Sequence, residues 1–185
     1  MRTRAILIAI FIGAVLLTLG ACNVLPTNVL GTRNENGGSR PTTAKIGALA
    51  PEINLKSMTG DQIVLSQFVG RPVLVNFWAT WCAPCRAEFP AFARKYKELK
   101  DQGFVILGVN TQDDNSDEGV LTFMRNSVVN FPIVRDRDDR LSAMYNVRGL
   151  PTSVFIDKQG IIRDSVIGGP MTDEFIDQQF KLISK

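Results

Sequence analysis

The chain has 185 residues, of which 45% are hydrophobic and 21% charged, and it contains three cysteines and no histidine. The lack of histidine excludes Ser-His and Cys-His nucleophile pairs, His-ligated metals and haem attachment through a CxxCH motif. The formal charge of +3 comes without the clustered cationic residues that binding to nucleic acid requires.

The first 22 residues have the pattern of an export signal. Arg2 and Arg4 precede an uncharged apolar stretch over residues 5–19, which is shorter than the roughly 20 residues that a helix needs to cross a bilayer. The stretch leads into LGAC, which resembles the bacterial lipobox, where the cysteine is lipidated and becomes the first mature residue. The resemblance implies a signal peptide over residues 1–21, a lipid on Cys22 and a location outside the cytoplasm. An uncleaved signal-anchor and an ordinary signal with a chance cysteine are the alternatives.

Residues 22–45 are rich in Gly, Pro, Thr and Asn and have no amphipathic period, so they predict a flexible tether. Its typical span is on the order of 25–30 Å, enough to hold a domain just off a membrane surface. Loss of the signal removes two of the 21 basic residues and leaves a mature chain that is close to neutral. Residues 46–185 suit one domain with one hydrophobic core.

Within this domain, apolar runs and turn residues alternate in the order of an α/β fold. The expected strands cover residues 53–56, 62–65, 73–79, 104–110, 131–134, 152–157 and 161–168. The expected helices run from the cysteine pair to about residue 99, from an N-cap at Ser116 to about Ser127, up to Asn146, and from Thr172 onward. This order predicts a mixed β-sheet with helices on both faces.

Two charged segments, residues 111–119 (TQDDNSDEG) and 135–140 (RDRDDR), are expected to be solvent-exposed. The first has neither the spacing nor the distal glutamate of an EF-hand calcium loop.

Cys82 and Cys85 lie two residues apart in NFWATWCAPC, between a predicted strand and a predicted helix. A structural disulfide is disfavoured, because so short a loop constrains the unfolded chain very little. A zinc or iron site needs about four ligands, which the chain does not supply. The third interpretation is a redox dithiol.

The position of Cys82 favours the redox interpretation. At a helix N-terminus, unpaired amides and the helix dipole stabilise a thiolate. Cys85 lies about one turn further on, within reach of a mixed disulfide, and Pro84 suits the first turn. We therefore expect an accessible, anionic Cys82 with Cys85 beneath it. Trp81 is expected either to shield the sulfur or to pack against the sheet.

These motifs resemble those of the TlpA/ResA-type thiol–disulfide oxidoreductases, which are redoxin-like, membrane-tethered members of the thioredoxin superfamily. The resemblance covers residue 47 to the C-terminus and rests on VLVNFWATWCAPCRAEFPAF, VNFPIVRD and YNVRGLPTSVFIDKQGIIR. It implies a thioredoxin-like fold: a central mixed β-sheet flanked by helices, with an N-terminal β-hairpin and a βα insertion. It also implies an enzyme that exchanges dithiol for disulfide without a cofactor or metal.

The resemblance assigns further site residues. Pro151 in GLPTS matches the family's cis-proline, which would turn the backbone of Leu150 toward a bound substrate; Thr152 and Trp81 join them as expected substrate-binding residues. The alternative is an ordinary trans proline that opens a strand. Glu88 shares a helix face with Cys85 and is a candidate proton acceptor, unless it is only a glutamate favoured by the helix dipole.

Similar family members reduce the disulfides of apocytochrome c and are re-reduced by a membrane electron carrier of the CcdA/DsbD type. By that resemblance we expect a monomeric reductase of protein disulfides. A general disulfide oxidase or isomerase is an alternative, because the direction depends on the reduction potential. A peroxiredoxin is disfavoured, since its PxxxTxxC motif would need proline and threonine where this chain has Val75 and Ala79. A non-catalytic binding module is the remaining alternative.

Overall fold

The computed structural model describes residues 40–185. The predicted signal peptide, the lipidation of Cys22 and residues 22–39 of the predicted tether lie outside the described residues. Among residues 40–185, no helix has both the length and the hydrophobicity to cross a membrane.

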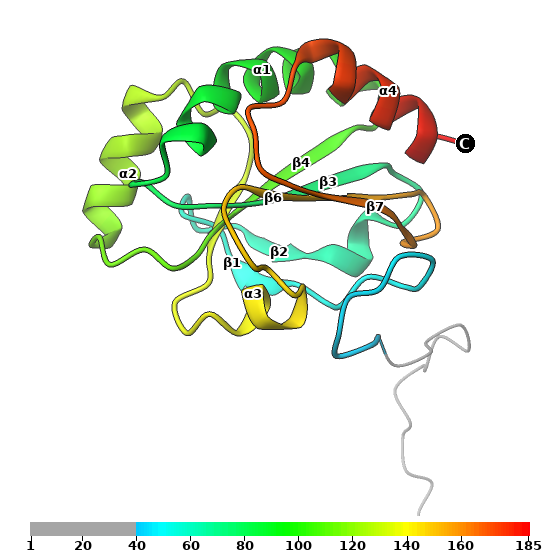
Figure 1. The fold of residues 1–185 in the computed structure, drawn as a ribbon, viewed down its shortest axis with the longest axis horizontal. Coiled ribbons are helices and arrows are strands. Elements are labelled where there is room, and N and C mark those ends of the chain that lie inside the picture. Colours follow the sequence, from blue (N-terminus) through cyan, green and yellow to red (C-terminus); the bar gives the residue numbers. More distant parts are fainter. Residues whose placement is uncertain (1–39) are drawn as a thin grey trace, which may run out of the picture. The chain divides into compact units, whose positions relative to one another are not determined.

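The described residues form seven strands and four α-helices, whose arrangement is shown in Figure 1. The strands are β1 (Asn54–Lys56), β2 (Gln62–Val64), β3 (Val73–Trp78), β4 (Val105–Asn110), β5 (Ile133–Arg135), β6 (Thr152–Ile156) and β7 (Ile162–Ile167). The helices are α1 (Ala83–Leu99), α2 (Asp117–Asn126), α3 (Arg140–Met144) and α4 (Asp173–Ile183). Two 3₁₀ turns, η1 (Leu65–Phe68) and η2 (Lys100–Gln102), lie before β3 and after α1.

The central sheet has the strand order β5-β4-β3-β6-β7. β3 and β5 each run parallel to β4, whereas β6 is antiparallel to both β3 and β7. β1 and β2 form a separate antiparallel hairpin. Helix α2 and strand β5 follow the β3-α1-β4 unit, where a βα insertion was expected, in the order helix and then strand. The mixed sheet, the hairpin and the insertion confirm the predicted thioredoxin-like fold.

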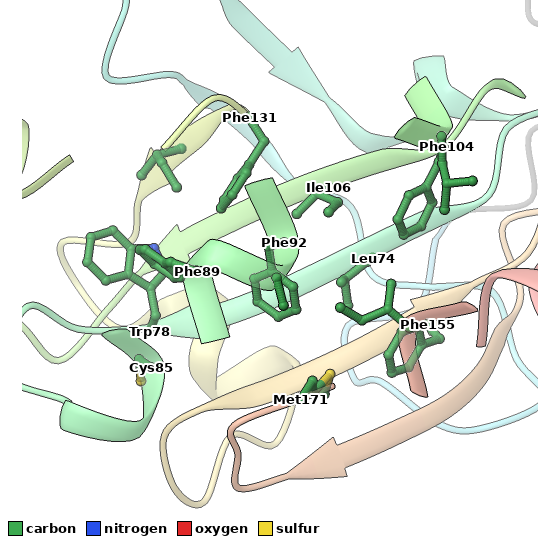
Figure 2. Packing of buried hydrophobic residues seen from close by; sticks show 14 of the residues in the cluster. Leu74, Trp78, Cys85, Phe89, Phe92, Phe104, Ile106, Phe131, Phe155 and Met171 are labelled. Atoms are coloured by element: carbon green, nitrogen blue, oxygen red, sulfur yellow. The ribbon is translucent and has the colours of Figure 1, made fainter. Parts of the chain in front are cut away.

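Helices cover both faces of the sheet. On one face, α1, α2 and α4 pack over a cluster that includes Leu74, Trp78 and Phe155 (Figure 2). On the other, α3 and the β1–β2 hairpin cover a second cluster that includes Val75 and Phe77. Neighbouring residues of β3 alternate between the two clusters because successive side chains of a strand point to opposite faces. Asn76 therefore points toward α1, together with Leu74 and Trp78.

The charged segment 135–140 is less exposed than predicted. The side chain of Asp136 is only 4% exposed. Its carboxylate accepts hydrogen bonds from the backbone N–H groups of Leu141 (2.9 Å) and Ser142 (2.8 Å). These amides belong to the first turn of α3 and have no partner within the helix. The prediction of an exposed segment was therefore wrong at Asp136, which is buried because it caps a helix.

Candidate active site

The cysteine pair lies where β3 leads into α1. Cys82 is the N-cap residue of α1, and Pro84 lies in the first turn. The Cys82 sulfur accepts a hydrogen bond from the backbone N–H of Cys85 at 3.3 Å. The two sulfurs form a disulfide, with the Cα atoms 5.3 Å apart. The predicted position at a helix N-terminus is confirmed, and there the free amides favour a thiolate once the disulfide is reduced.

Cys82 is less accessible than predicted. In this oxidised form it is 2% exposed and Cys85 is fully buried. Both belong to the cluster that lies under α1. The disulfide directs the Cys82 sulfur inward against Cys85, whereas the neighbouring Trp81, Ala83 and Pro84 are exposed. The expectation of an accessible outer sulfur is therefore wrong for the disulfide form.

Trp81 does not pack against the sheet. Its side chain is 60% exposed, and its indole N–H donates to the backbone carbonyl of Gln112 at 2.8 Å. This bond joins the residue before Cys82 to the loop after β4. The indole is thus a large apolar surface, fixed at one edge, beside the disulfide.

Asp113 ties the same loop to the segment before Trp81. Its carboxylate accepts hydrogen bonds from the backbone N–H (2.6 Å) and the hydroxyl (2.9 Å) of Thr80, and from the amide of Asn110 (2.8 Å). Burial raises the pKa of Asp113, but these bonds outweigh it and the pKa is lowered. Most of the loop is solvent-exposed, as predicted, but Asp113 is half-buried and bonded to the segment before Trp81. No local pattern connects Asp113 to Thr80, because they are 33 residues apart.

The Leu150–Pro151 peptide bond is cis, as the family resemblance implied. Pro151 precedes β6, in which Thr152 pairs with Phe77 near the end of β3, so both lie at the Cys82 end of the sheet. The backbone carbonyl of Pro151 accepts a hydrogen bond from Gly168 at 2.8 Å. The Thr152 hydroxyl is buried and donates to the carbonyl of Gly149 at 2.7 Å. Leu150 is half-buried against both hydrophobic clusters.

Glu88 is a fully buried carboxyl group on the same helix as Cys85. Its Oε1 accepts a hydrogen bond from the side-chain amide of Asn76 at 2.8 Å, and the same amide donates to Ser153 Oγ at 2.9 Å. Its Oε2 makes no hydrogen bond of normal geometry, although the backbone N–H of Met171 lies close enough to lower the pKa of the carboxyl group. Burial raises the pKa of Glu88 to about 8, although the bond from Asn76 lowers it in part. Glu88 can therefore gain or lose a proton near neutral pH, as a general acid or base must.

Asn76 and Ser153 were not among the predicted site residues. They face each other across β3 and β6. An asparagine inside the otherwise apolar run VLVNFW was the signal that was available, because a buried polar side chain requires a partner. Among residues 40–185, no group of three or more His, Cys, Asp or Glu side chains is arranged to hold a metal ion.

Comparison with known proteins points to thiol–disulfide exchange. Residues 46–165 match the AhpC/TSA family. The chain is 40% identical to the thiol-disulfide oxidoreductase ResA of Bacillus subtilis over 137 residues, which cover 74% of this chain and 75% of that protein. It is 38% identical to ResA of Geobacillus kaustophilus over 142 residues, 77% of this chain and 80% of the relative.

Solved structures agree with the sequence relatives. The exposed lipoprotein thioredoxin Etrx1 of Streptococcus pneumoniae superposes with a TM-score of 0.64 at 30% identity, covering 71% of this chain and 98% of that one. StoA of Bacillus subtilis gives a TM-score of 0.62 at 28% identity, covering 71% and 97%. The fold is thus shared with a protein named a thioredoxin, and the sequence is similar to that of thiol-disulfide oxidoreductases.

Proposed function

Since the chain belongs to the AhpC/TSA family and is a thiol–disulfide oxidoreductase, we propose that it acts outside the cytoplasm as a membrane-tethered reductase of protein disulfides. Disulfides of apocytochrome c are its candidate substrates. The observation that carries the proposal is the Cys82–Cys85 pair at the N-terminus of α1, with the buried Glu88 on the same helix.

The reaction starts from the reduced form. The Cys82 thiolate attacks one sulfur of a client disulfide, the client's S–S bond breaks, and one client thiolate leaves. Cys85 then gives its proton to ionised Glu88 and attacks the Cys82 sulfur. The second client thiolate leaves, and the Cys82–Cys85 disulfide forms. Two electrons have passed to the client, and the enzyme is left in the oxidised form described here.

Glu88 suits this proton transfer because its raised pKa of about 8 lies close to the ordinary value of a cysteine thiol. A proton moves efficiently between groups of similar pKa. Trp81, Leu150, Pro151 and Thr152 lie at the same end of the sheet as the disulfide and are the proposed substrate-binding residues. The backbone of Leu150 would pair with an extended client segment.

Attachment to the membrane rests on the sequence before residue 40. The export signal, the LGAC motif and the predicted tether support a lipid on Cys22, and the structural relative Etrx1 is an exposed lipoprotein. A membrane electron carrier of the CcdA/DsbD type would return the enzyme to its reduced form. The monomeric state stays a prediction.

The proposal can be tested by trapping client proteins on the enzyme in membrane preparations. A Cys85→Ser variant retains the attacking thiol but cannot release the client, so we expect it to accumulate mixed disulfides. The matched Cys82→Ser variant should trap few. Recovery of apocytochromes would support the maturation role, whereas a broad set of secreted proteins would support general disulfide exchange. If neither variant captures a client and the wild type does not reduce insulin, the binding-module alternative would replace the enzyme.

The reduction potential decides the direction of electron flow. We expect a value near or below the thioredoxin range of about −270 mV, and a value near that of a strong oxidant, about −120 mV, would contradict the reductase role.

A further inference from the structure

The carboxyl group of Glu88 is held from two sides. Asn76 binds Oε1, as described above. The other oxygen faces the backbone of Gly169, because a Cβ atom at position 169 would lie only 2.7 Å from Glu88 Oε2. The same Cβ atom would lie 3.1 Å from Cγ of Pro151. Gly169 thus fills the narrow space between the glutamate and the cis-proline, and no larger residue fits without displacing one of them.

A left-handed backbone does not account for this glycine. Gly168 has a φ of 92°, which favours glycine, whereas Gly169 is not among the residues with positive φ. The requirement at position 169 is therefore the close approach of the backbone to another group. Gly168 is anchored by its hydrogen bond to the Pro151 carbonyl, and Met171 is buried in the cluster under α1. Both ends of the segment 168–171 are fixed, so it cannot easily move away from Glu88.

Gly169 also covers Glu88 on one side. Gly169 is exposed, whereas Glu88, directly beneath it, is fully buried. Water that reached the carboxyl group would solvate its charged form and lower its pKa, so the raised pKa depends on this cover.

We propose that Gly169 is a positioning residue for Glu88: the missing side chain lets the segment 168–171 close over the carboxyl group and hold it, shielded from water, on the helix face of Cys85. The inference rests on the proposed role of Glu88 as the proton acceptor. Gly169 itself neither binds the client nor transfers a proton.

The substitution Gly169→Ala tests the proposal. The new methyl group must push the carboxyl group inward or the segment 168–171 outward, and the second movement admits water. Because burial is the main cause of the raised pKa of Glu88, we expect that pKa to fall from about 8 toward its ordinary 4.5. Carbon-13 NMR titration of the labelled carboxyl group measures this directly.

The second measurement is the rate of the resolving step, in which Cys85 attacks the Cys82 sulfur and releases the client. Reduced enzyme is mixed with insulin, and the mixed disulfide is followed by acid quench and thiol labelling from pH 5 to 10. We expect Gly169→Ala to slow its release at least about tenfold at pH 7, a fraction of what a positioned acid or base contributes. The midpoint of the pH profile should also fall by one pH unit or more. Gly119→Ala is the matched control, because a Cβ there would meet Asn115 at an ordinary 3.4 Å; it should alter the rate less than twofold.

A double variant shows whether the effect passes through Glu88. In a Glu88→Ala background the oxygen that opposes the methyl group is gone, so Gly169→Ala should change the rate less than twofold. An equal loss in both backgrounds would overturn the inference and place the effect at Pro151. An unchanged pKa of Glu88 together with an unchanged rate in Gly169→Ala would overturn it as well.

The same variants distinguish a loss of stability from a loss of function, and a failure of the proposed role of Glu88 from a failure of the proposed role of Gly169. If Gly169→Ala alone does not fold, the double variant should fold and regain most of the lost melting temperature; equal instability of the two would contradict the contact. If Glu88→Ala releases insulin at the wild-type rate, the proposed proton transfer fails, whereas a slow Glu88→Ala beside a normal Gly169→Ala removes only the role of Gly169.

Discussion

Glu88 should make the folded protein less stable as the pH rises, which is the opposite of what an ion-paired carboxylate does. Below pH 4.5 the carboxyl group is protonated in both the folded and the unfolded chain, so it adds no pH dependence. Between 4.5 and about 8 the unfolded chain has lost this proton and the folded chain has kept it. Folding then takes up a proton, and the free energy of unfolding falls by about 1.36 kcal/mol per pH unit. Above pH 8 the loss reaches its full value of about 5 kcal/mol.

The substitution Glu88→Gln removes this titration and keeps the size of the side chain. The amide oxygen of the introduced glutamine can still accept the hydrogen bond from Asn76. Its NH₂ group replaces an oxygen that makes no hydrogen bond of normal geometry and is left without an acceptor, which costs about 1–3 kcal/mol at every pH. The informative quantity is therefore the change with pH: relative to wild type, we expect the variant to gain about 4 kcal/mol between pH 5 and pH 9.

Urea unfolding of the oxidised protein at pH 5, 7 and 9 measures this gain by linear extrapolation. Glu174→Gln is the control, because Glu174 is an exposed glutamate on α4; its difference from wild type should vary with pH by no more than about 0.5 kcal/mol. If the curves of wild type and Glu88→Gln stay parallel from pH 5 to 9, Glu88 is not a buried titrating group and its proposed proton transfer loses its physical basis.

Three further substitutions test the contacts that shape the site and its scaffold. Asp113→Ala leaves the backbone N–H of Thr80 unpaired, so we expect the free energy of unfolding in urea to fall by about 2 kcal/mol and insulin reduction to slow. Normal values for both would refute the role of this loop. Tyr145→Phe removes the buried bond to the Pro51 carbonyl and should cost about 1–2 kcal/mol without slowing insulin reduction. Ser116→Ala removes the N-cap of α2 and should cost about 1 kcal/mol; an unchanged melting temperature would show that the cap contributes nothing.

Local signals made most of the elements predictable. Ser116 and Thr172 accept hydrogen bonds from the backbone N–H groups of Gly119 and Phe175, so the predicted starts of α2 and α4 are confirmed. The continuous apolar runs 73–79 and 104–110 became β3 and β4, both buried along their whole length. Each of these signals lies within a few residues of the feature that it specifies.

Contacts between distant segments were not predictable in the same way. Asp113 reads as one more acidic residue in a polar loop, and only the fold brings it to Thr80. Gly169 reads as the second glycine of a turn, yet it is needed because Glu88, 81 positions earlier, fills the space that its side chain would occupy. A single sequence records the residue types at such positions but not the partners that select them.

The cost of burying Glu88 is linked to what it can do. A glutamate in water has a pKa near 4.5 and is too weak a base to take a proton from a thiol at neutral pH. The surroundings that raise its pKa to about 8 are the apolar cluster under α1 and the segment 168–171, and the same surroundings destabilise the folded state as the pH rises. A change that opens this site to water should therefore stabilise the protein at pH 9 and slow the resolving step together. A variant that gains both stability and speed at that pH would break this link.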